Sequence, residues 1–104
     1  MTDYEFIRNT ITPDDMLCQL AEEAAELAQA ALKLRRAVGS TNPTPVTRSE
    51  ATEELITEIA DTAVAVKVYL ACDAAVGLDD VIKRIMSRKT ARWVERLRKK
   101  KESR

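Results

Sequence analysis

Apolar residues recur at intervals of three and four along most of the chain, which is the period of an α-helix. The first such segment begins at Thr12-Pro13, where a hydroxyl N-cap precedes a proline at the first helical position. Its last turns carry basic side chains followed by Gly39, which is typical of a helix C-terminus. We therefore expect a long helix over residues 13–38, with residues 1–11 forming an arm or a short helix.

Two further helices are predicted after a loop. Residues 39–46 contain two prolines separated by a single residue, together with Gly, Ser and Asn, and this composition opposes a helix. Thr47, with Glu50 three residues later, has the spacing of a capping box at a helix start. Gly77 marks the end of that helix. The predicted bounds are residue 48 to residue 75 or 76, and residue 79 or 80 to about residue 98.

The apolar stripes of the first two helices indicate how they pack. In the first helix the stripe consists of Leu17, Leu20, Ala24, Leu27, Ala28, Ala31 and Leu34. In the second it consists of Leu55, Ile59, Ala63, Val66 and Leu70, and a further apolar side consists of Ala60, Val64, Val68, Ala71 and Cys72. A helix that is apolar on more than one side needs more than one covering surface. We predict an all-α, antiparallel bundle of three main helices that is completed by oligomerisation, as a homodimer or a homotetramer.

Composition is consistent with one helical domain. The 104 residues suffice for a single domain, which we assign to residues 1–98, with residues 99–104 as a basic tail that frays into solvent. Only two Gly and three Pro occur, which disfavours a β-rich fold. The formal net charge is zero, but eleven of the 17 basic residues lie in residues 81–104. An acidic body with a basic last helix could bring a cation site and an anion-binding surface together.

The cysteines and the first residues predict a cytoplasmic protein. Cys18 and Cys72 lack metal-type spacing and fall within helical apolar patterns, so we interpret them as reduced core thiols, with a disulfide as the alternative. The first residues contain neither a basic side chain nor an apolar run, so no signal peptide is expected. The most apolar stretch, residues 59–76, is interrupted by charged side chains, so no membrane span is expected.

Two acidic motifs carry the candidate chemistry, Glu22-Glu23-Ala24-Ala25-Glu26 and Glu58-Ile59-Ala60-Asp61. Carboxylates three or four residues apart share one helix face, so two such faces turned toward each other would gather several oxygens in a small volume. Such a cluster repels itself unless hard divalent cations lie within it. The alternative is that these acids are the solvated faces of two amphipathic helices. Against it, like-charge pairs at this spacing cost a few tenths of a kcal/mol each.

The two motifs, in this order and separated by a proline-containing loop, resemble the signature of the MazG-like all-α nucleoside triphosphate pyrophosphohydrolases. The similarity extends to Gln19-Leu20-Ala21, to the residues after Glu26 and to Gly77-Leu78-Asp79-Asp80, and it covers roughly residues 12–94. The resemblance implies a helical bundle that dimerises or assembles further. It also implies Mg²⁺, with Mn²⁺ as a substitute, and hydrolysis of a nucleoside triphosphate between the α and β phosphates. The metal ligands that it implies are Glu23, Glu26, Glu58 and Asp61.

Other residues are candidates for contact with the substrate. Glu22, or a carboxylate not fully used in coordination, is the candidate to accept the proton of the attacking water. Pyrophosphate is highly charged, and the basic residues of the last helix are available to bind it. The candidate substrate-binding residues are Gln19, Lys83, Lys89 and Arg92. An asparagine that similar proteins often carry has no counterpart near Trp93, and the chain has no histidine, which disfavours the related phosphoribosyl-ATP pyrophosphohydrolases.

Two other classes of function compete with the enzyme. The basic C-terminal helix fits a nucleic-acid-binding or adaptor module, in which cationic side chains contact phosphates without sequence preference. Against this, the chain lacks a recognition motif and its acidic body would repel a duplex. A purely structural helical oligomer is the third class, and it leaves the acidic motifs without a role. We therefore predict a Mg²⁺-dependent nucleotide pyrophosphohydrolase.

Overall fold

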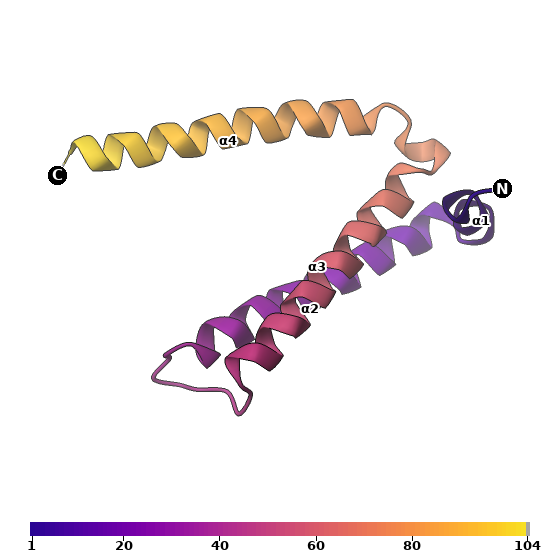
Figure 1. Cartoon of the computed structure of the whole chain (residues 1–104). Helices are drawn as coiled ribbons and strands as arrows, with labels where there is room; N and C mark the ends of the chain where they lie inside the picture. Colours follow the sequence, from indigo (N-terminus) through magenta and orange to yellow (C-terminus); the bar gives the residue numbers. More distant parts are fainter. Residues whose placement is uncertain (104) are drawn as a thin grey trace. The chain divides into compact units, whose positions relative to one another are not determined.

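The computed structural model describes residues 1–103, and this part of the chain contains α-helices, one 3₁₀ turn and connecting loops, with no strand (Figure 1). The elements are α1 (Asp3–Thr10), α2 (Pro13–Ala37), α3 (Arg48–Leu70), the 3₁₀ turn η1 (Asp73–Ala75) and α4 (Leu78–Glu102). The predicted all-α class is confirmed. The chain divides into two compact units, Met1–Ala74 and Ala75–Arg104, and each is described by itself.

Both predicted N-caps are present. The hydroxyl of Thr12 accepts a hydrogen bond from the backbone N–H of Asp15 at 3.2 Å, and that of Thr47 accepts one from Glu50 at 3.1 Å. Each cap satisfies a backbone donor that has no partner within its helix. The helix starts were therefore readable from local sequence.

The end of α3 differs from the prediction. The helix ends at Leu70 and not at residue 75 or 76, because the next amides bond three residues back, Cys72 to the carbonyl of Tyr69 at 3.1 Å. This tightening leads into η1, and Gly77 then takes a left-handed conformation with φ of 83° before α4. The apolar pattern continues beyond Leu70, but the α-helix does not.

The C-terminal unit consists mainly of α4. This helix continues to Glu102, so residues 99–102 are helical, although we predicted that they fray. Its last turn carries Lys99, Lys100 and Lys101, and basic side chains stabilise the negative end of a helix dipole. Residue 104 lies outside the described residues.

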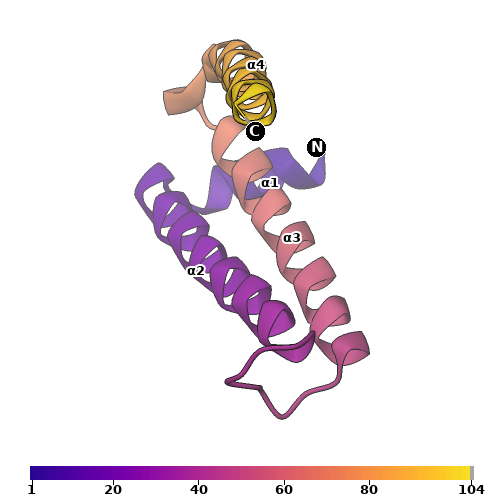
Figure 2. The ribbon, with the colours of Figure 1, turned by 90° about the vertical axis from the view of Figure 1, so that its left-hand side faces the viewer.

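In the N-terminal unit, α2 and α3 form an antiparallel hairpin joined by the proline loop (Figure 2). The fully buried side chains of the two helices are mostly small: Ala30 of α2 and Ala51 and Ala65 of α3. Alanines at a helix contact allow the two backbones to approach closely, as ridges and grooves pack. Met16 is the largest fully buried side chain, near the start of α2.

The predicted apolar stripes have the correct period but the wrong phase. The least exposed residues of α2 include Met16, Leu20, Glu23, Leu27, Ala30 and Leu34, whereas Leu17, Ala24, Ala28 and Ala31 are exposed. On α3 they include Ala51, Leu55, Glu58, Thr62, Ala65 and Val68, whereas Ile59, Ala63 and Val66 are exposed. Close packing through alanines turns the acidic edge of each helix toward its neighbour. Cys72 is buried as predicted, but Cys18 is exposed, and both thiols are free.

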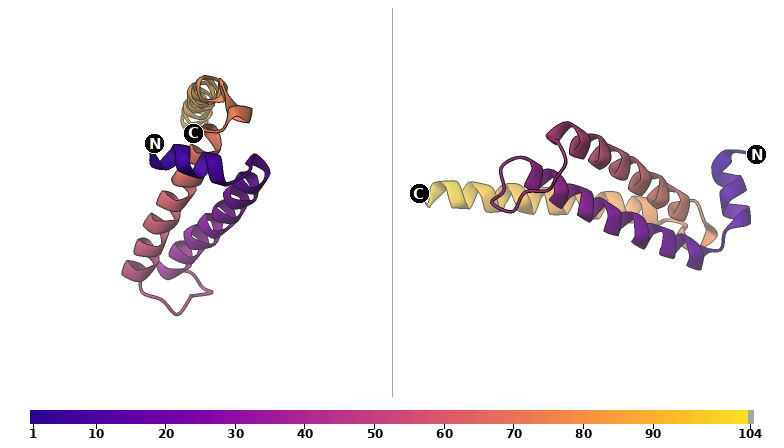
Figure 3. Two further views of the ribbon diagram at one scale, coloured as in Figure 1. Left: turned by 90° about the vertical axis from the view of Figure 1, so that its right-hand side faces the viewer. Right: turned by 90° about the horizontal axis from the view of Figure 1, so that it is seen from below.

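Helix α1 lies across the end of the hairpin that is opposite the proline loop (Figure 3). Thr2 and Glu5 form a complete capping box at its start. Near its end, the guanidinium of Arg8 donates a hydrogen bond to the carbonyl of Ala71, at 3.4 Å, just beyond α3. Since terminal helix carbonyls lack partners in their own helix, this contact stabilises both elements.

Much of the apolar surface of α3 faces solvent in the single chain. Ile56 and Ile59 are each at least half exposed, at 60% and 51%. Exposed apolar residues on one helix are the surface for which we predicted a covering partner. None of the helices among residues 1–103 is sufficiently long and apolar to span a membrane.

Candidate metal centre

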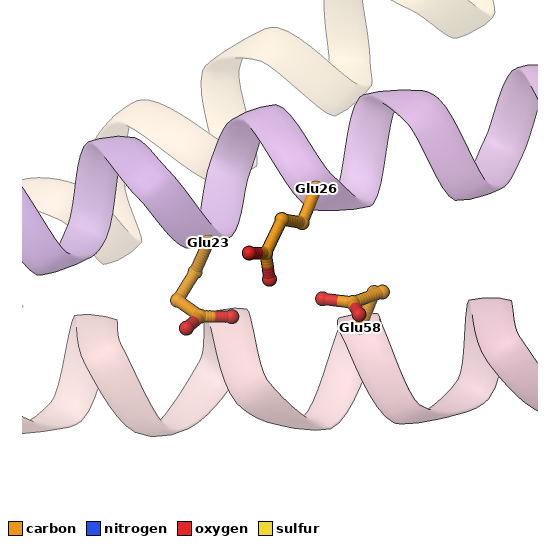
Figure 4. Close-up of side chains that lie close together, drawn as sticks. All are labelled: Glu23, Glu26 and Glu58. Carbon is orange, nitrogen blue, oxygen red and sulfur yellow. The ribbon is translucent and has the colours of Figure 1, made fainter.

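Three carboxylates from two helices converge midway along the hairpin. Glu23 and Glu26 project from α2 toward α3, and Glu58 projects from α3 toward α2 (Figure 4). One carboxylate oxygen of each residue lies within 4.8 Å of one from each of the others. Glu23 and Glu58 are half-buried, and Glu26 is exposed. The two motifs are therefore brought together, as predicted, by the antiparallel register of α2 and α3.

Contacts on either side of the acidic cluster hold that register. The hydroxyl of Thr62 lies 2.8 Å from the carbonyl of Glu58 and 3.2 Å from that of Glu23, so its proton can bond within α3 or across to α2. Toward the proline loop, the ammonium of Lys33 binds the carboxylate of Glu54 at 3.0 Å. These contacts place residues that are distant in sequence opposite one another.

The surroundings of the cluster disfavour its negative charge. Burial raises the pKa of Glu23 and of Glu58, and the charges of Glu26 and Asp61 raise both further. The side-chain amide of Gln19 donates to Oε1 of Glu23 at 2.8 Å, which opposes the effect on that residue. Among the described residues, the salt bridges pair Lys33, Lys83 and Lys99 with acids outside the cluster. The cluster therefore lacks a compensating side-chain cation in the described chain.

The donor set fits a hard divalent cation. Oε2 of Glu23 and Oε2 of Glu58 are buried and have no hydrogen-bond partner, although a buried carboxylate oxygen without one is costly. Two oxygens on opposite sides of one Mg²⁺ are about 4.2 Å apart, since each bond is about 2.1 Å long. The carboxylate oxygens of Glu23, Glu26 and Glu58 lie within 4.8 Å of one another, which is compatible with one cation among them. A cation here would satisfy both orphaned oxygens and offset the mutual repulsion.

Three other predicted site residues, Asp61, Glu22 and Gln19, lie outside the convergent group of three. Asp61 is near enough to raise the pKa of both half-buried acids, although it lies outside the group of three. Glu22 is exposed and also lies outside that group, so the geometry gives no support to its predicted role as proton acceptor. The side-chain amide of Gln19 is hydrogen-bonded to the carboxylate of Glu23.

The predicted phosphate-binding residues Lys83, Lys89 and Arg92 belong to α4, in the C-terminal unit, which is described by itself. Lys83 is paired within its own helix with Asp79, at 3.2 Å. A charge pair at this helical spacing contributes only about 0.3–0.5 kcal/mol. Binding an anionic group would therefore compete with only a weak contact at Lys83.

A pocket of about 580 Å³ adjoins the acidic centre, because Glu23 belongs to both, and Asp61 also lines the pocket. Its other lining residues come from α1 with its C-cap residue, from α2 and from α3: Ile7, Ile11, Asp15, Met16, Gln19, Val64, Ala65 and Val68. Sequence reasoning missed Asp15 and the α1 residues, because nothing in their local pattern shows which helix they face. The isoleucines of α1 did carry one usable signal, since an amphipathic arm needs a surface to cover.

Thr62 is a second residue that the sequence did not reveal. Replacing it with valine removes the hydroxyl that can link α3 to the carbonyl of Glu23, and we expect the free energy of unfolding to fall by about 0.5–1.5 kcal/mol. The matched control is Thr57→Val, since the Thr57 hydroxyl donates only to Glu53 of its own helix. Urea unfolding followed by helical circular dichroism measures both changes. Equal losses in the two variants would contradict an interhelical role for Thr62.

No protein-family model matches the chain, and neither does any curated protein or solved structure.

Proposed function

We propose that the protein is a Mg²⁺-dependent nucleotide pyrophosphohydrolase that cleaves nucleoside triphosphates between the α and β phosphates. Glu23, Glu26, Glu58 and Asp61 would hold the cation, and Mn²⁺ would substitute for Mg²⁺. The observation that carries the proposal is the convergence of carboxylates from α2 and α3 with two buried, unpartnered oxygens. The resemblance of the two acidic motifs to the MazG-like signature is the second support.

Each part of the site would have a definite task. Bound divalent cations would neutralise the triphosphate and lower the pKa of a coordinated water. The hairpin already brings Glu23, Glu26 and Glu58 together without a ligand, which would lower the cost of ordering them around a cation. Because Glu22 is exposed and lies outside the convergent group, a carboxylate of that group that is not fully used in coordination is the better candidate to accept the proton of the attacking water. The neighbouring pocket gives the rest of a nucleotide a place beside the phosphates.

The test is hydrolysis of a panel of ribo- and deoxyribonucleoside triphosphates with Mg²⁺, in which pyrophosphate and orthophosphate are quantified separately. We expect pyrophosphate and a nucleoside monophosphate as the products. In ¹⁸O-labelled water, the label should enter the monophosphate, because water attacks the α phosphorus and the bond to the bridging oxygen breaks. Label in the pyrophosphate would contradict this bond cleavage. Absence of turnover with every nucleotide would contradict the enzyme altogether.

We also propose that the functional protein is a homo-oligomer, in which a second copy covers the exposed apolar face of α3. The support is the exposure of large apolar residues on a helix whose opposite face already packs on α2. Light scattering at increasing protein concentration should give a mass of two or four chains of 11.6 kDa. A stable monomer at micromolar concentration would contradict this assembly.

A nucleic-acid-binding module is the second candidate, and α4 is the observation that favours it. Considered by itself, this helix carries ten basic and four acidic residues in 25 positions. Fluorescence anisotropy with a labelled duplex and a labelled single strand tests it. Binding that weakens steeply with salt, together with no nucleotide hydrolysis, would favour this candidate over the enzyme.

A further inference from the structure

The pocket beside the acidic centre has the size and position to hold part of a small ligand. Its volume of about 580 Å³ is typical of small-molecule sites, which span roughly 300–1,000 Å³. Because Glu23 and Asp61 line the pocket, a ligand whose charged group reaches the carboxylates extends naturally into it. The two features are therefore parts of one continuous site.

Most of the pocket wall is apolar. Ile7 comes from α1, Ile11 directly follows that helix, Met16 comes from α2, and Val64, Ala65 and Val68 come from α3. On the α1 side, the Arg8 side chain donates a hydrogen bond to the carbonyl of Ala71, which links α1 to the segment after α3. Such a wall favours a flat, weakly hydrated ring over a sugar or a phosphate, because aliphatic side chains offer no hydrogen bonds to replace those with water.

The remaining polar groups of the pocket present acceptors. The carboxylate oxygens of an aspartate such as Asp15 accept hydrogen bonds. The amide of Gln19 directs an N–H to Glu23, which leaves its carbonyl oxygen as an acceptor. A ring that carries an amino group can donate to these atoms. If the ring carried a carbonyl at the same place, its oxygen would face an oxygen of the pocket, and neither acceptor would have a hydrogen-bond donor.

From this arrangement, we infer that the pocket holds the nucleobase and that Asp15 selects bases with an exocyclic amino group over those with a carbonyl at that position. The inference rests on the proposed function, because that function puts the triphosphate at the acidic centre. Beyond that function, the inference states that the pocket prefers cytosine to uracil, and adenine to hypoxanthine. These pairs differ little in shape but exchange a donor for an acceptor.

The chain provides a matched control for Asp15. Asp14 is also an acidic residue in the first turn of α2, where either carboxylate favours the positive end of the helix dipole. Asp14 is absent from the pocket lining, whereas Asp15 belongs to it. Asp15→Asn and Asp14→Asn should therefore have similar effects on stability and different effects on base preference.

The experiment separates binding from hydrolysis. Calorimetry with Mg²⁺ would compare the α,β-imido analogues of dCTP and dUTP, which cannot be cleaved at the proposed bond. We expect the native protein to bind the cytosine analogue at least about tenfold more tightly, as one lost hydrogen bond at a partly open site implies. In Asp15→Asn the preference should fall below about threefold, because an amide both donates and accepts. In Asp14→Asn it should remain.

Each outcome is decisive. Equal affinity for the two analogues, tighter binding of the uracil analogue, or no binding of either would overturn the inference. An unchanged preference in Asp15→Asn would overturn the role of that residue. A preference in binding that depends on Asp15, without pyrophosphate release from dCTP, would support the base pocket and contradict the proposed hydrolysis. Hydrolysis of dCTP and dUTP with equal kcat/KM would support the enzyme and contradict the selection.

Discussion

Glu58→Gln is expected to lower Mg²⁺-dependent pyrophosphate release by at least about 100-fold. The carboxylate that it removes is one of the three that converge, and cation-assisted hydrolysis relies on several kcal/mol of charge stabilisation, with about 1.4 kcal/mol for each factor of ten. Without metal, the same variant should be more stable than the native protein, because a half-buried charge beside Glu26 and Asp61 is lost. Initial rates at saturating Mg²⁺ and thermal melting in EDTA measure the two effects.

Opposite signs for activity and stability are what distinguish a binding carboxylate from a structural one. The matched control is Glu53→Gln, since Glu53 is an exposed acid of the same helix outside the cluster. In Glu53→Gln, both the activity and the melting temperature should stay close to those of the native protein. A Glu58→Gln protein that retains full activity would remove the main support for the proposed function. One that loses its helical signal would show that Glu58 is needed for the fold.

The helices themselves could be predicted because their signals are local. Thr12 and Thr47 cap the N-termini of α2 and α3 through bonds to residues only three positions away. A cap of this kind contributes about 1 kcal/mol wherever the helix packs, so it is visible without tertiary information. The end of α3 lacked such a signal, since no glycine or proline follows Leu70 directly.

The facing sides of α2 and α3 could not be predicted, because both helices are apolar on several sides. We placed the acids at the edge of the core and Leu17 and Ile59 within it. The structure instead packs Ala30, Ala51 and Ala65 between the helices and exposes those larger residues. In an alanine-rich helix the apolar period determines that a helix forms, but close approach of small residues decides its rotation.

The candidate site was predictable only in part. Spacing alone showed that the carboxylates of each motif share one helix face, but not that the two faces meet. The resemblance of the motifs implied Glu23, Glu26, Glu58 and Asp61 as ligands, and the structure brings the first three together. The pocket was not predictable, since its walls come from α1, α2 and α3 and depend on where α1 docks. The basic residues of α4 remain predicted ligands of the phosphates.

The metal-free protein should become less stable as pH rises above 4.5. Glu23 and Glu58 have pKa values raised from 4.5 in the folded state, so the folded protein binds their protons more tightly than the unfolded chain does. That contribution is fully present below pH 4.5 and is lost as pH rises through the raised values. Mg²⁺ should reverse the loss, because it binds the ionised carboxylates, and its stabilising effect should grow with pH. Urea midpoints between pH 4 and 8, with Mg²⁺ and with EDTA, measure this.

The contribution of the two acids has to be separated from that of the other carboxylates, which titrate in the same range. The double variant Glu23→Gln, Glu58→Gln provides that separation, because both glutamines stay neutral at every pH. Relative to it, the native protein should lose stability with rising pH in EDTA and regain it with Mg²⁺. Parallel pH profiles for the two proteins would mean that the folded state does not disfavour these charges. An equal gain from Mg²⁺ in both would place the cation at other residues, since the double variant keeps only Glu26 of the convergent group.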